Sequence, residues 1–156
     1  MGIGTQNVAL AVSGYKSGNQ RHVENYDGVS WSINKIVPVA FRDGDSDGGT
    51  DSSAGIFFGG VGPAIWSNAF TYDCVASTCV GSWSIGGDLI TARFLIGGFG
   101  TQNAGAAAGG GTPTRLSCNE EYNGSTWSAG GALITGRSIL GAAGTQNEGV
   151  ACADGS

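Results

Sequence analysis

An acidic segment in the first third of the chain has the clearest potential for metal chemistry. In RDGDSDGGTD, the carboxylates of Asp43, Asp45 and Asp47 alternate with small residues. A D-x-D-x-D-G order opens many calcium loops, because alternate carboxylates can converge on one hard cation. Asp51 falls at the ninth position of such a loop, but Ala54 stands where a bidentate Glu would complete the ligand set. The sequence leaves open a calcium site on these four aspartates and a solvated acidic turn.

The four cysteines offer redox chemistry. Cys74 and Cys79 bound the segment CVASTC, where a disulfide would close an extended turn between two antiparallel strands. Cys118 and Cys152 offer a second pairing, within one chain or between chains. Free thiols are the alternative for all four. Disulfides would indicate maturation outside a reducing cytosol.

Residues for catalysis or ligand binding are few. His22 is the single histidine, and the chain has neither a G-x-S-x-G nor an H-E-x-x-H motif, so we expect no enzyme activity. Trp66 lies in the variable segment GVGPAIWSN and has no counterpart elsewhere in the chain. Together with Tyr15 it is a candidate for stacking on a sugar or anchoring a partner, and simple packing is the alternative.

Composition narrows the classes of partner. The 156-residue chain has a net charge of −5, and 12% of its residues are charged, about half of the ~25% usual in soluble domains. An acidic chain is a poor match for nucleic acid, because phosphates call for a basic face. No apolar run approaches the ~20 residues of a membrane span, so we expect no membrane insertion.

An internal repeat organises the chain. The tetrapeptide GTQN begins at Gly4, Gly100 and Gly144, and a degenerate copy, GTDS, begins at Gly49. Each unit then places a tyrosine, a tryptophan and an arginine in the same order: Tyr26, Trp31 and Arg42; Tyr72, Trp83 and Arg93; Tyr122, Trp127 and Arg137. We expect the aromatic residues to pack in the core or between units, and the arginines to bond strand carbonyls or carboxylates between units.

Each unit is predicted to form four short strands. Segments such as VALAVSG, AGIFFGG and AGAAAGG follow the tetrapeptide, and segments ending in ENYDG, FTYDC or EEYNG follow a variable loop. Short strands separated by Asp-Gly and Asn-Gly turns are typical of all-β proteins, and no stretch keeps a helical period. We therefore predict one all-β repeat domain over 1–156, with units at about 4–48, 49–99, 100–143 and 144–156.

These motifs resemble the kelch repeat of β-propellers, in which a Gly-Gly pair follows the second strand, a Tyr-Asp pair follows the third and a tryptophan lies on the fourth; here unit one has Ser-Gly for the first pair and unit three has Tyr-Asn for the second. They are most similar to the glycine-rich GTQN, EEYNG, W and TAR repeats of bacteriophage and environmental bacterial proteins. The resemblance implies four-stranded, propeller-type blades. About three units are fewer than the four to eight blades of a closed propeller. By this count the chain lacks the first strand of unit one and ends after the second strand of a fourth unit.

Open terminal units would leave unpaired strand edges, which soluble proteins avoid. We therefore expect partial units to be completed by strand exchange or by oligomerisation, in a ring or a filament. The favoured function is a non-enzymatic structural or adhesive protein of a virion appendage or extracellular filament, with itself and other virion proteins as partners. It would need no cofactor, calcium being the one candidate. The alternative is a carbohydrate-binding propeller module for cell-surface glycans.

Overall fold

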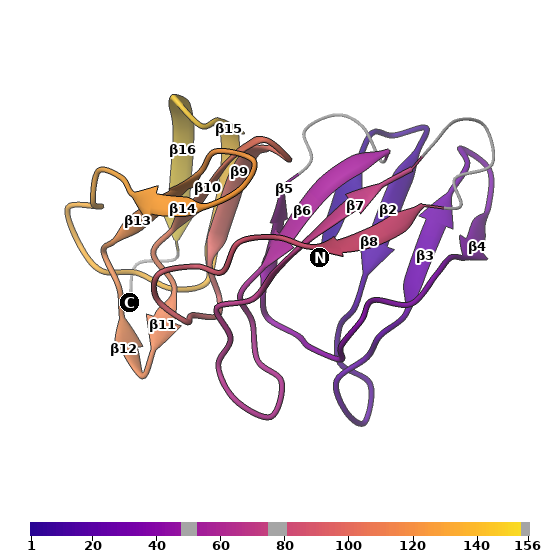
Figure 1. The fold of residues 1–156 in the computed structure, drawn as a ribbon, viewed down its shortest axis with the longest axis horizontal. Coiled ribbons are helices and arrows are strands. Elements are labelled where there is room, and N and C mark those ends of the chain that lie inside the picture. The colour runs from indigo at the N-terminus through magenta and orange to yellow at the C-terminus, as the bar shows by residue number, and fades with distance from the viewer. Residues whose placement is uncertain (48–52, 75–80, 154–156) are drawn as a thin grey trace.

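The computed structural model describes residues 1–47, 53–74 and 81–153. All regular elements in these ranges are β-strands, so the all-β prediction is confirmed (Figure 1). Accordingly, the described residues hold no helix that could cross a membrane.

Three four-stranded sheets form the body of the structure, and each is an antiparallel meander in chain order. A two-stranded hairpin, called the terminal hairpin here, follows the third sheet, and a small β11–β12 hairpin extends the loop before β13. The first sheet holds β1 (Gly2–Gly4), β2 (Ala9–Val12), β3 (Val23–Tyr26) and β4 (Trp31–Ile33). The second sheet holds β5 (Asp45–Asp47), β6 (Ala54–Phe58), β7 (Ala69–Asp73) and β8 (Ser82–Ile85). The third holds β9 (Gly97–Thr101), β10 (Ala104–Ala108), β13 (Asn119–Tyr122) and β14 (Trp127–Ala129), with β11 (Gly111–Thr112) and β12 (Thr114–Arg115) beside it. The terminal hairpin is β15 (Leu140–Thr145) and β16 (Glu148–Ala153).

The tyrosine and tryptophan markers occupy equivalent places in the three sheets. Tyr26 pairs with Trp31 across β3 and β4, and their ring centroids lie 5.1 Å apart. The corresponding pairs, Tyr72–Trp83 and Tyr122–Trp127, both have centroids 5.0 Å apart. In all three sheets the tilted rings pack across the third and fourth strands, so the predicted repeat corresponds to one sheet per unit.

The position of the tetrapeptide corrects one expectation. GTQN forms the turn between the first and second strands of a sheet, so each sheet begins before the tetrapeptide rather than at it. The first sheet is complete, because β1 pairs with β2 through Gly2, Ile3 and Gly4. The prediction that the chain lacks this strand was wrong, since three residues suffice to form it. After the third sheet, the described residues form the terminal hairpin, in which β15 pairs with β16.

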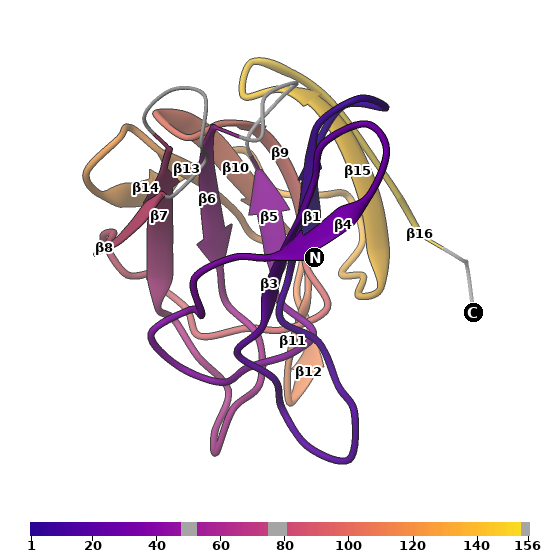
Figure 2. The ribbon, with the colours of Figure 1, turned by 90° about the vertical axis from the view of Figure 1, so that its right-hand side faces the viewer.

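The sheets stand side by side, with the first at the right of Figure 1 and the third at the left. The first strands of successive sheets are neighbours, β1 next to β5, β5 next to β9 and β9 next to β15. The loops between second and third strands, residues 13–22, 59–68 and 109–118, project from one edge of the array. Figure 2 looks onto the first sheet from its uncovered side.

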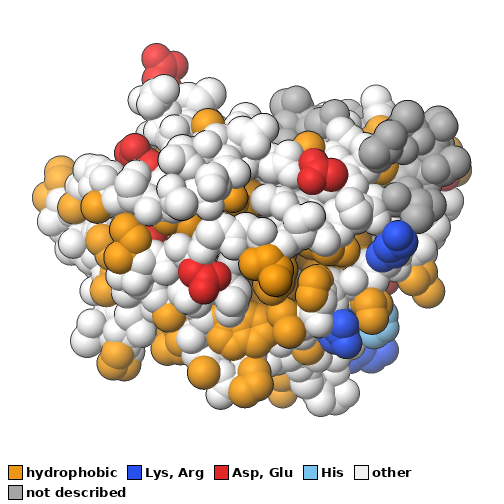
Figure 3. All heavy atoms as spheres, viewed as in Figure 1, with side chains coloured by type: hydrophobic (Ala, Val, Ile, Leu, Met, Phe, Trp, Pro, Cys, Tyr) orange, Lys and Arg blue, Asp and Glu red, His pale blue; other side chains and the backbone are white. Residues whose placement is uncertain are grey.

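The hydrophobic core lies between sheets rather than within one. One cluster joins Leu10 and Val12 of the first sheet to Phe57 and Tyr72 of the second. A second cluster joins the second sheet to Tyr122 and Trp127 of the third. Because burial of apolar surface is the main favourable term in folding, each sheet depends on its neighbours for stability. The face in Figure 3 carries few charged side chains: the acidic ones lie apart from one another, and the basic ones gather at the right of the view beside the histidine.

The acidic segment differs from its expected form. Residues 45–47 form strand β5 instead of a loop, and Asp45 lies opposite Phe58 in the register with β6. Asp45 thus occupies the place that Gly97 takes in the third sheet, where Gly97 lies opposite Ala108. These residues are extended because they pair with β6, a mostly buried strand of apolar residues with high β-propensity.

Candidate functional site

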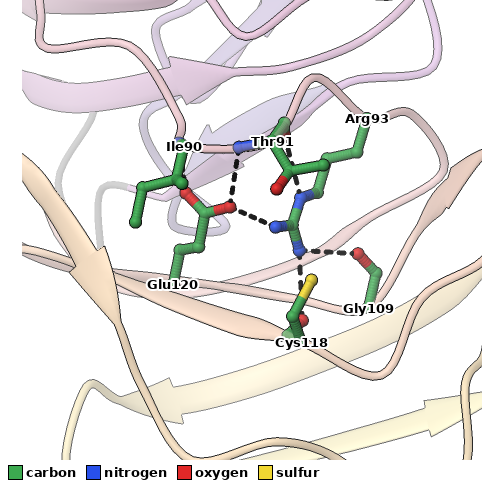
Figure 4. Close-up of polar contacts among 6 residues, drawn as sticks. All are labelled: Ile90, Thr91, Arg93, Gly109, Cys118 and Glu120. Atoms are coloured by element: carbon green, nitrogen blue, oxygen red, sulfur yellow. Dashed lines mark hydrogen bonds and ion pairs between the residues drawn. The ribbon is translucent and has the colours of Figure 1, made fainter.

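A buried arginine joins the second sheet to the third (Figure 4). The Arg93 side chain is fully buried and lies between the two sheets. Its Nη1 donates to the carbonyl oxygens of Gly109 and Cys118, both at 3.1 Å, and its Nε donates to Thr91 O at 3.2 Å. Its Nη2 forms an ion pair with Oε1 of Glu120. The prediction that a repeated arginine bonds carbonyls and a carboxylate between units is confirmed for Arg93.

The carboxylate of Glu120 has a complete set of donors. Besides the Arg93 guanidinium, it accepts hydrogen bonds from the backbone N–H of Ile90 at 2.7 Å and from that of Thr91 at 3.1 Å. Glu120 projects from β13 of the third sheet, whereas its three donors belong to the segment that leaves the second sheet. A buried charge is tolerated only when it is paired and hydrogen-bonded, and this site meets both conditions.

The contact between the first and second sheets uses the same positions with different chemistry. The N–H of Arg93 donates to Trp66 O, and the equivalent N–H in the first unit is that of Phe41, which donates to Gln20 O. Phe41 is therefore the structural counterpart of Arg93. It packs against Phe70, the counterpart of Glu120, with ring centroids 6.3 Å apart. An aromatic pair here replaces the ion pair.

Arg42 was aligned with Arg93 in the sequence, and that alignment was wrong by one residue. The Arg42 side chain is 40% exposed and forms an ion pair with Asp43 Oδ2 at 2.6 Å. Its guanidinium also lies over the ring of Tyr15, 5.1 Å from the centroid. The signal that finds the true counterpart is a strict spacing of ten residues, since Phe41 follows Trp31 by the interval at which Arg93 follows Trp83.

Asp45 and Ser46 tie the inner strand of the second sheet to both neighbours. Asp45 Oδ2 accepts a hydrogen bond from Gly98 N of the third sheet at 2.5 Å, and Ser46 Oγ donates to Gly2 O of the first at 3.1 Å. Burial raises the pKa of Asp45 above its ordinary value, while N–H groups of Ser46 and Gly98 act in the opposite direction.

The proposed calcium ligands have other partners where the structure describes them. Asp43 pairs with Arg42, and Asp45 accepts backbone N–H bonds. Asp47 lies in β5, where its side chain is not described, and Asp51 lies outside the described residues. The described part of the chain holds no cluster of three His, Cys, Asp or Glu residues suited to a metal. Calcium binding at this segment stays a prediction.

The glutamine of the tetrapeptide makes contacts that the sequence did not reveal. Gln102 Nε2 in the third sheet reaches back to Tyr72 O of the second sheet at 3.2 Å and to Asp73 Oδ1 at 2.9 Å. Gln146 in the terminal hairpin likewise donates to Tyr122 O of the third sheet at 2.8 Å. The recurrence of GTQN was the signal, because a repeated polar residue in a turn implies a repeated partner.

A groove of about 430 Å³ runs along the inner strands. Its lining is mostly glycine and alanine from β1, β9 and β15, with Ser46 from β5. The small residues let the inner strands approach one another closely: a Cβ on Gly98 would lie 2.9 Å from the Phe58 ring and 3.2 Å from Ser46 O.

The two candidate ligand-binding aromatic residues lie in different hollows. Trp66 lines an open hollow of about 430 Å³ together with Pro63 and Val39, and it also packs on Phe41 with centroids 5.8 Å apart. Tyr15 is 68% exposed and lines another hollow, of about 600 Å³, on the first sheet. The structure does not bring the two rings into one site.

Three of the four cysteines, Cys74, Cys118 and Cys152, lie in the described residues. Cys79 lies outside the described residues, so the Cys74–Cys79 bridge stays a prediction. Cys118 and Cys152 are free thiols, and Cys152 Sγ lies 3.3 Å from Gly141 O. Cys118 precedes β13, where its carbonyl binds Arg93. A bridge between these two cysteines within one chain is therefore not formed here, and pairing between chains stays a prediction.

Comparisons with known proteins bear on the fold alone. No protein-family model and no curated protein matches the chain. Among solved structures, the chain is similar to a fungal alcohol oxidase described as having catalytic diversity among the AA5 family, in complex with copper. The similarity has a TM-score of 0.65 at 14% identity and covers 89% of this chain. The chain spans about a third (32%) of the oxidase. One fold hosts many activities, so this likeness does not carry over the oxidase chemistry.

Proposed function

We propose that this chain is a non-enzymatic structural or adhesive protein of a virion appendage, such as a phage tail, fibre or decoration, or of an extracellular filament. Its kelch-like units correspond to propeller-type blades, and it works through self-assembly and the variable loops along one edge of the array. The carrying observation is that the sheets are held together by side chains between units, as Arg93 and Glu120 do between the second and third sheets. An array built in this way leaves a contact surface at each end.

Self-assembly is tested by sedimentation velocity and negative-stain electron microscopy of the purified chain. We expect rings or filaments at micromolar concentrations. A monodisperse monomer with the circular dichroism of a folded β-protein would contradict the proposal.

A second candidate function is carbohydrate binding, which the open hollow beside Trp66 favours. An exposed aromatic face beside a loop can stack on a sugar ring. A glycan array tests it: binding that is lost in Trp66→Ala and kept in Trp31→Ala would support this alternative. No binding by the wild-type chain would remove it.

A further inference from the structure

The two ends of the array carry opposite halves of the Arg93–Glu120 contact. Arg137, after the third sheet, is the counterpart of Arg93, since its N–H donates to Leu116 O as that of Arg93 donates to Trp66 O. Glu24, on β3 of the first sheet, is the counterpart of Glu120. Each lies two residues before the tyrosine of its sheet and opposite the last residue of the fourth strand, Ile33 for Glu24 and Ala129 for Glu120. Both side chains are exposed, and neither has a partner among the described residues.

The arginine end carries donor groups at the positions of those that bind Glu120 between the second and third sheets. We call the Arg137 guanidinium with the N–H groups of Ile134 and Thr135 the tail site. These three groups correspond to the Arg93 guanidinium and to the two N–H groups that hold Glu120. Within the described ranges, neither tail-site N–H has an acceptor. The site opens into a hollow of about 350 Å³ that Leu133 and Leu140 also line.

The tail site requires a charged partner rather than an aromatic one. Where the first sheet meets the second, the position of Ile90 is taken by Pro38, which has no N–H to satisfy, and the opposing residue is Phe70. The tail site has Ile134 at this position, and with it a free N–H beside Arg137. Its three donors therefore match the ionic version of the contact.

The first sheet presents a matching surface. We call the side of β3 and β4 that bears Glu24, Trp31 and Ile33 the head face. In the third sheet the counterpart of Trp31 is Trp127, which packs edge-on against Phe58 of the second sheet at 5.0 Å and is 7% exposed. Trp31 itself is 52% exposed. The head face therefore exposes Glu24 and Trp31, whose counterparts Glu120 and Trp127 are buried in the third sheet, beside a hollow of about 600 Å³.

The terminal hairpin marks the place that a docked sheet would take. It repeats the turn of the first hairpin, with Gly144 at φ 133° and Gly4 at φ 126°, and Gln146 makes the contact to Tyr122 O. Gln6, the counterpart of Gln146, is exposed and has no side-chain partner among the described residues. Most residues of the terminal hairpin are exposed, whereas β1 and β2 bury their apolar side chains. Releasing the terminal hairpin is therefore the less costly exchange.

We propose that a second copy of this chain docks head to tail, its first sheet displacing the terminal hairpin and seating Glu24 in the tail site. The Arg137 guanidinium then pairs with the Glu24 carboxylate, Ile134 N and Thr135 N donate to it, and Gln6 takes over the contact of Gln146. This head-to-tail contact rests on the proposed self-assembly and is the interface through which the copies would associate. Because the two surfaces differ, the contact is heterologous and repeats into a ring or a filament.

A charge-swap experiment tests the pairing. Glu24→Arg and Arg137→Glu each place like charges at the contact, so each variant alone should associate at least ~30-fold more weakly than wild type in sedimentation velocity. In a mixture of the two variants, Arg137→Glu still carries Glu24 and Glu24→Arg still carries Arg137, so the two should re-form the wild-type contact and recover association with each other. The double variant reverses the ion pair but sets a guanidinium against the N–H groups of Ile134 and Thr135, so it should recover only part of the wild-type association.

Controls separate this contact from bulk charge. Glu148→Arg and Lys35→Glu change exposed charges by the same amounts and should assemble as wild type does. Circular dichroism and thermal unfolding check that each variant folds. If a reversal does not fold, Glu24→Gln and Arg137→Gln replace it and should still weaken association.

The outcomes distinguish the two proposals. A monomeric wild-type chain would contradict the proposed self-assembly and this interface together. Wild-type assembly that both single variants retain would overturn only this interface. Loss of assembly in the single variants without recovery in their mixture would also overturn it, because the two charges would then act at different contacts.

Discussion

The contacts on either side of the second sheet occupy equivalent positions but have opposite chemistry. Towards the first sheet, Phe41 packs against Phe70, and both are buried. Towards the third sheet, Arg93 pairs with Glu120, and both are again buried. The backbone accommodates either version, because the residues change together. The same two positions of each unit therefore make the contact between neighbouring sheets, and the side chains at these positions determine which sheet can pack there.

The ionic contact loses more free energy of unfolding than the aromatic contact when one of its two side chains is removed. An apolar pair that loses one member leaves a cavity, whereas a buried ion pair that loses one member leaves an uncompensated charge. A sheet that presents the ionic half of the contact is therefore specific for a sheet with the opposite charge, and one that presents a phenylalanine is specific for an aromatic partner. This difference explains how sheets of one fold can be held in a fixed sequence along the array.

The largest expected effect comes from removing one half of the ionic contact. Arg93→Met leaves the Glu120 carboxylate buried with only two backbone donors, so we expect a loss of about 3–5 kcal/mol in the free energy of unfolding. Urea denaturation followed by tryptophan fluorescence measures it. Arg42→Met is the matched control and should cost less than about 1 kcal/mol, because that arginine is 40% exposed. Equal losses in the two variants would contradict the comparison.

Converting the ionic contact into the aromatic one sharpens the comparison. In Arg93→Phe/Glu120→Phe no charge is left buried, so this double variant should be more stable than either single variant. A double-mutant cycle should give a coupling energy of about 1–3 kcal/mol. Recovery should be incomplete, because Ile90 N and Thr91 N lose their acceptor. Additive effects of the two substitutions would show that the residues do not act as a pair.

A smaller effect is expected at the turn glutamines. Gln102→Ala removes the hydrogen bonds to Tyr72 O and Asp73 Oδ1 and should lower the free energy of unfolding by about 1 kcal/mol. Gln6→Ala is its control in the monomer, since Gln6 has no partner among the described residues. Its stability should stay within about 0.5 kcal/mol of wild type. A larger loss in Gln6→Ala than in Gln102→Ala would refute the assigned contacts.

The smallest expected effect is a pH dependence at Asp45. Burial raises its pKa in the folded state above the ordinary value of 3.8, so the folded chain holds this proton more tightly than the unfolded chain does. Its contribution to stability is therefore present at low pH and is lost as the pH rises through the folded-state pKa. We would measure the free energy of unfolding of wild type and of Asp45→Asn from below pH 3.8 to neutrality. The contribution of the Asp45 carboxyl should be lost with rising pH in wild type alone. Parallel curves would contradict the role of burial.

The regular markers allowed the architecture to be predicted from the sequence. The Tyr and Trp positions placed the third and fourth strands of each unit correctly, because each tyrosine lies opposite its tryptophan in the strand register, whether five or eleven residues separate them. The strand at Gly2–Gly4 was missed, since three residues with two glycines have no strand signal of their own. The strand at Asp45–Asp47 was not predicted, because aspartate has a low β-propensity. Its extended backbone depends on pairing with β6.

The contact between units was harder to predict than the fold. Arg93 was assigned to inter-unit bonding, yet nothing in the sequence identified Glu120 as its partner or Phe41 as its counterpart. Both assignments depend on which side chains face each other between sheets, and that information is tertiary. The tail site was hidden for the same reason, because two of its three donors are backbone N–H groups.

If copies join head to tail, the Arg93–Glu120 contact recurs between them at the ends of the array. A cryo-electron microscopy structure of the assembled chain, at side-chain resolution, would show the contact itself. We expect the Glu24 carboxylate of one copy within hydrogen-bonding distance of the Arg137 guanidinium of the next, with the terminal hairpin displaced. Copies joined instead through the free edge of β16, with Arg137 in solvent, would contradict it.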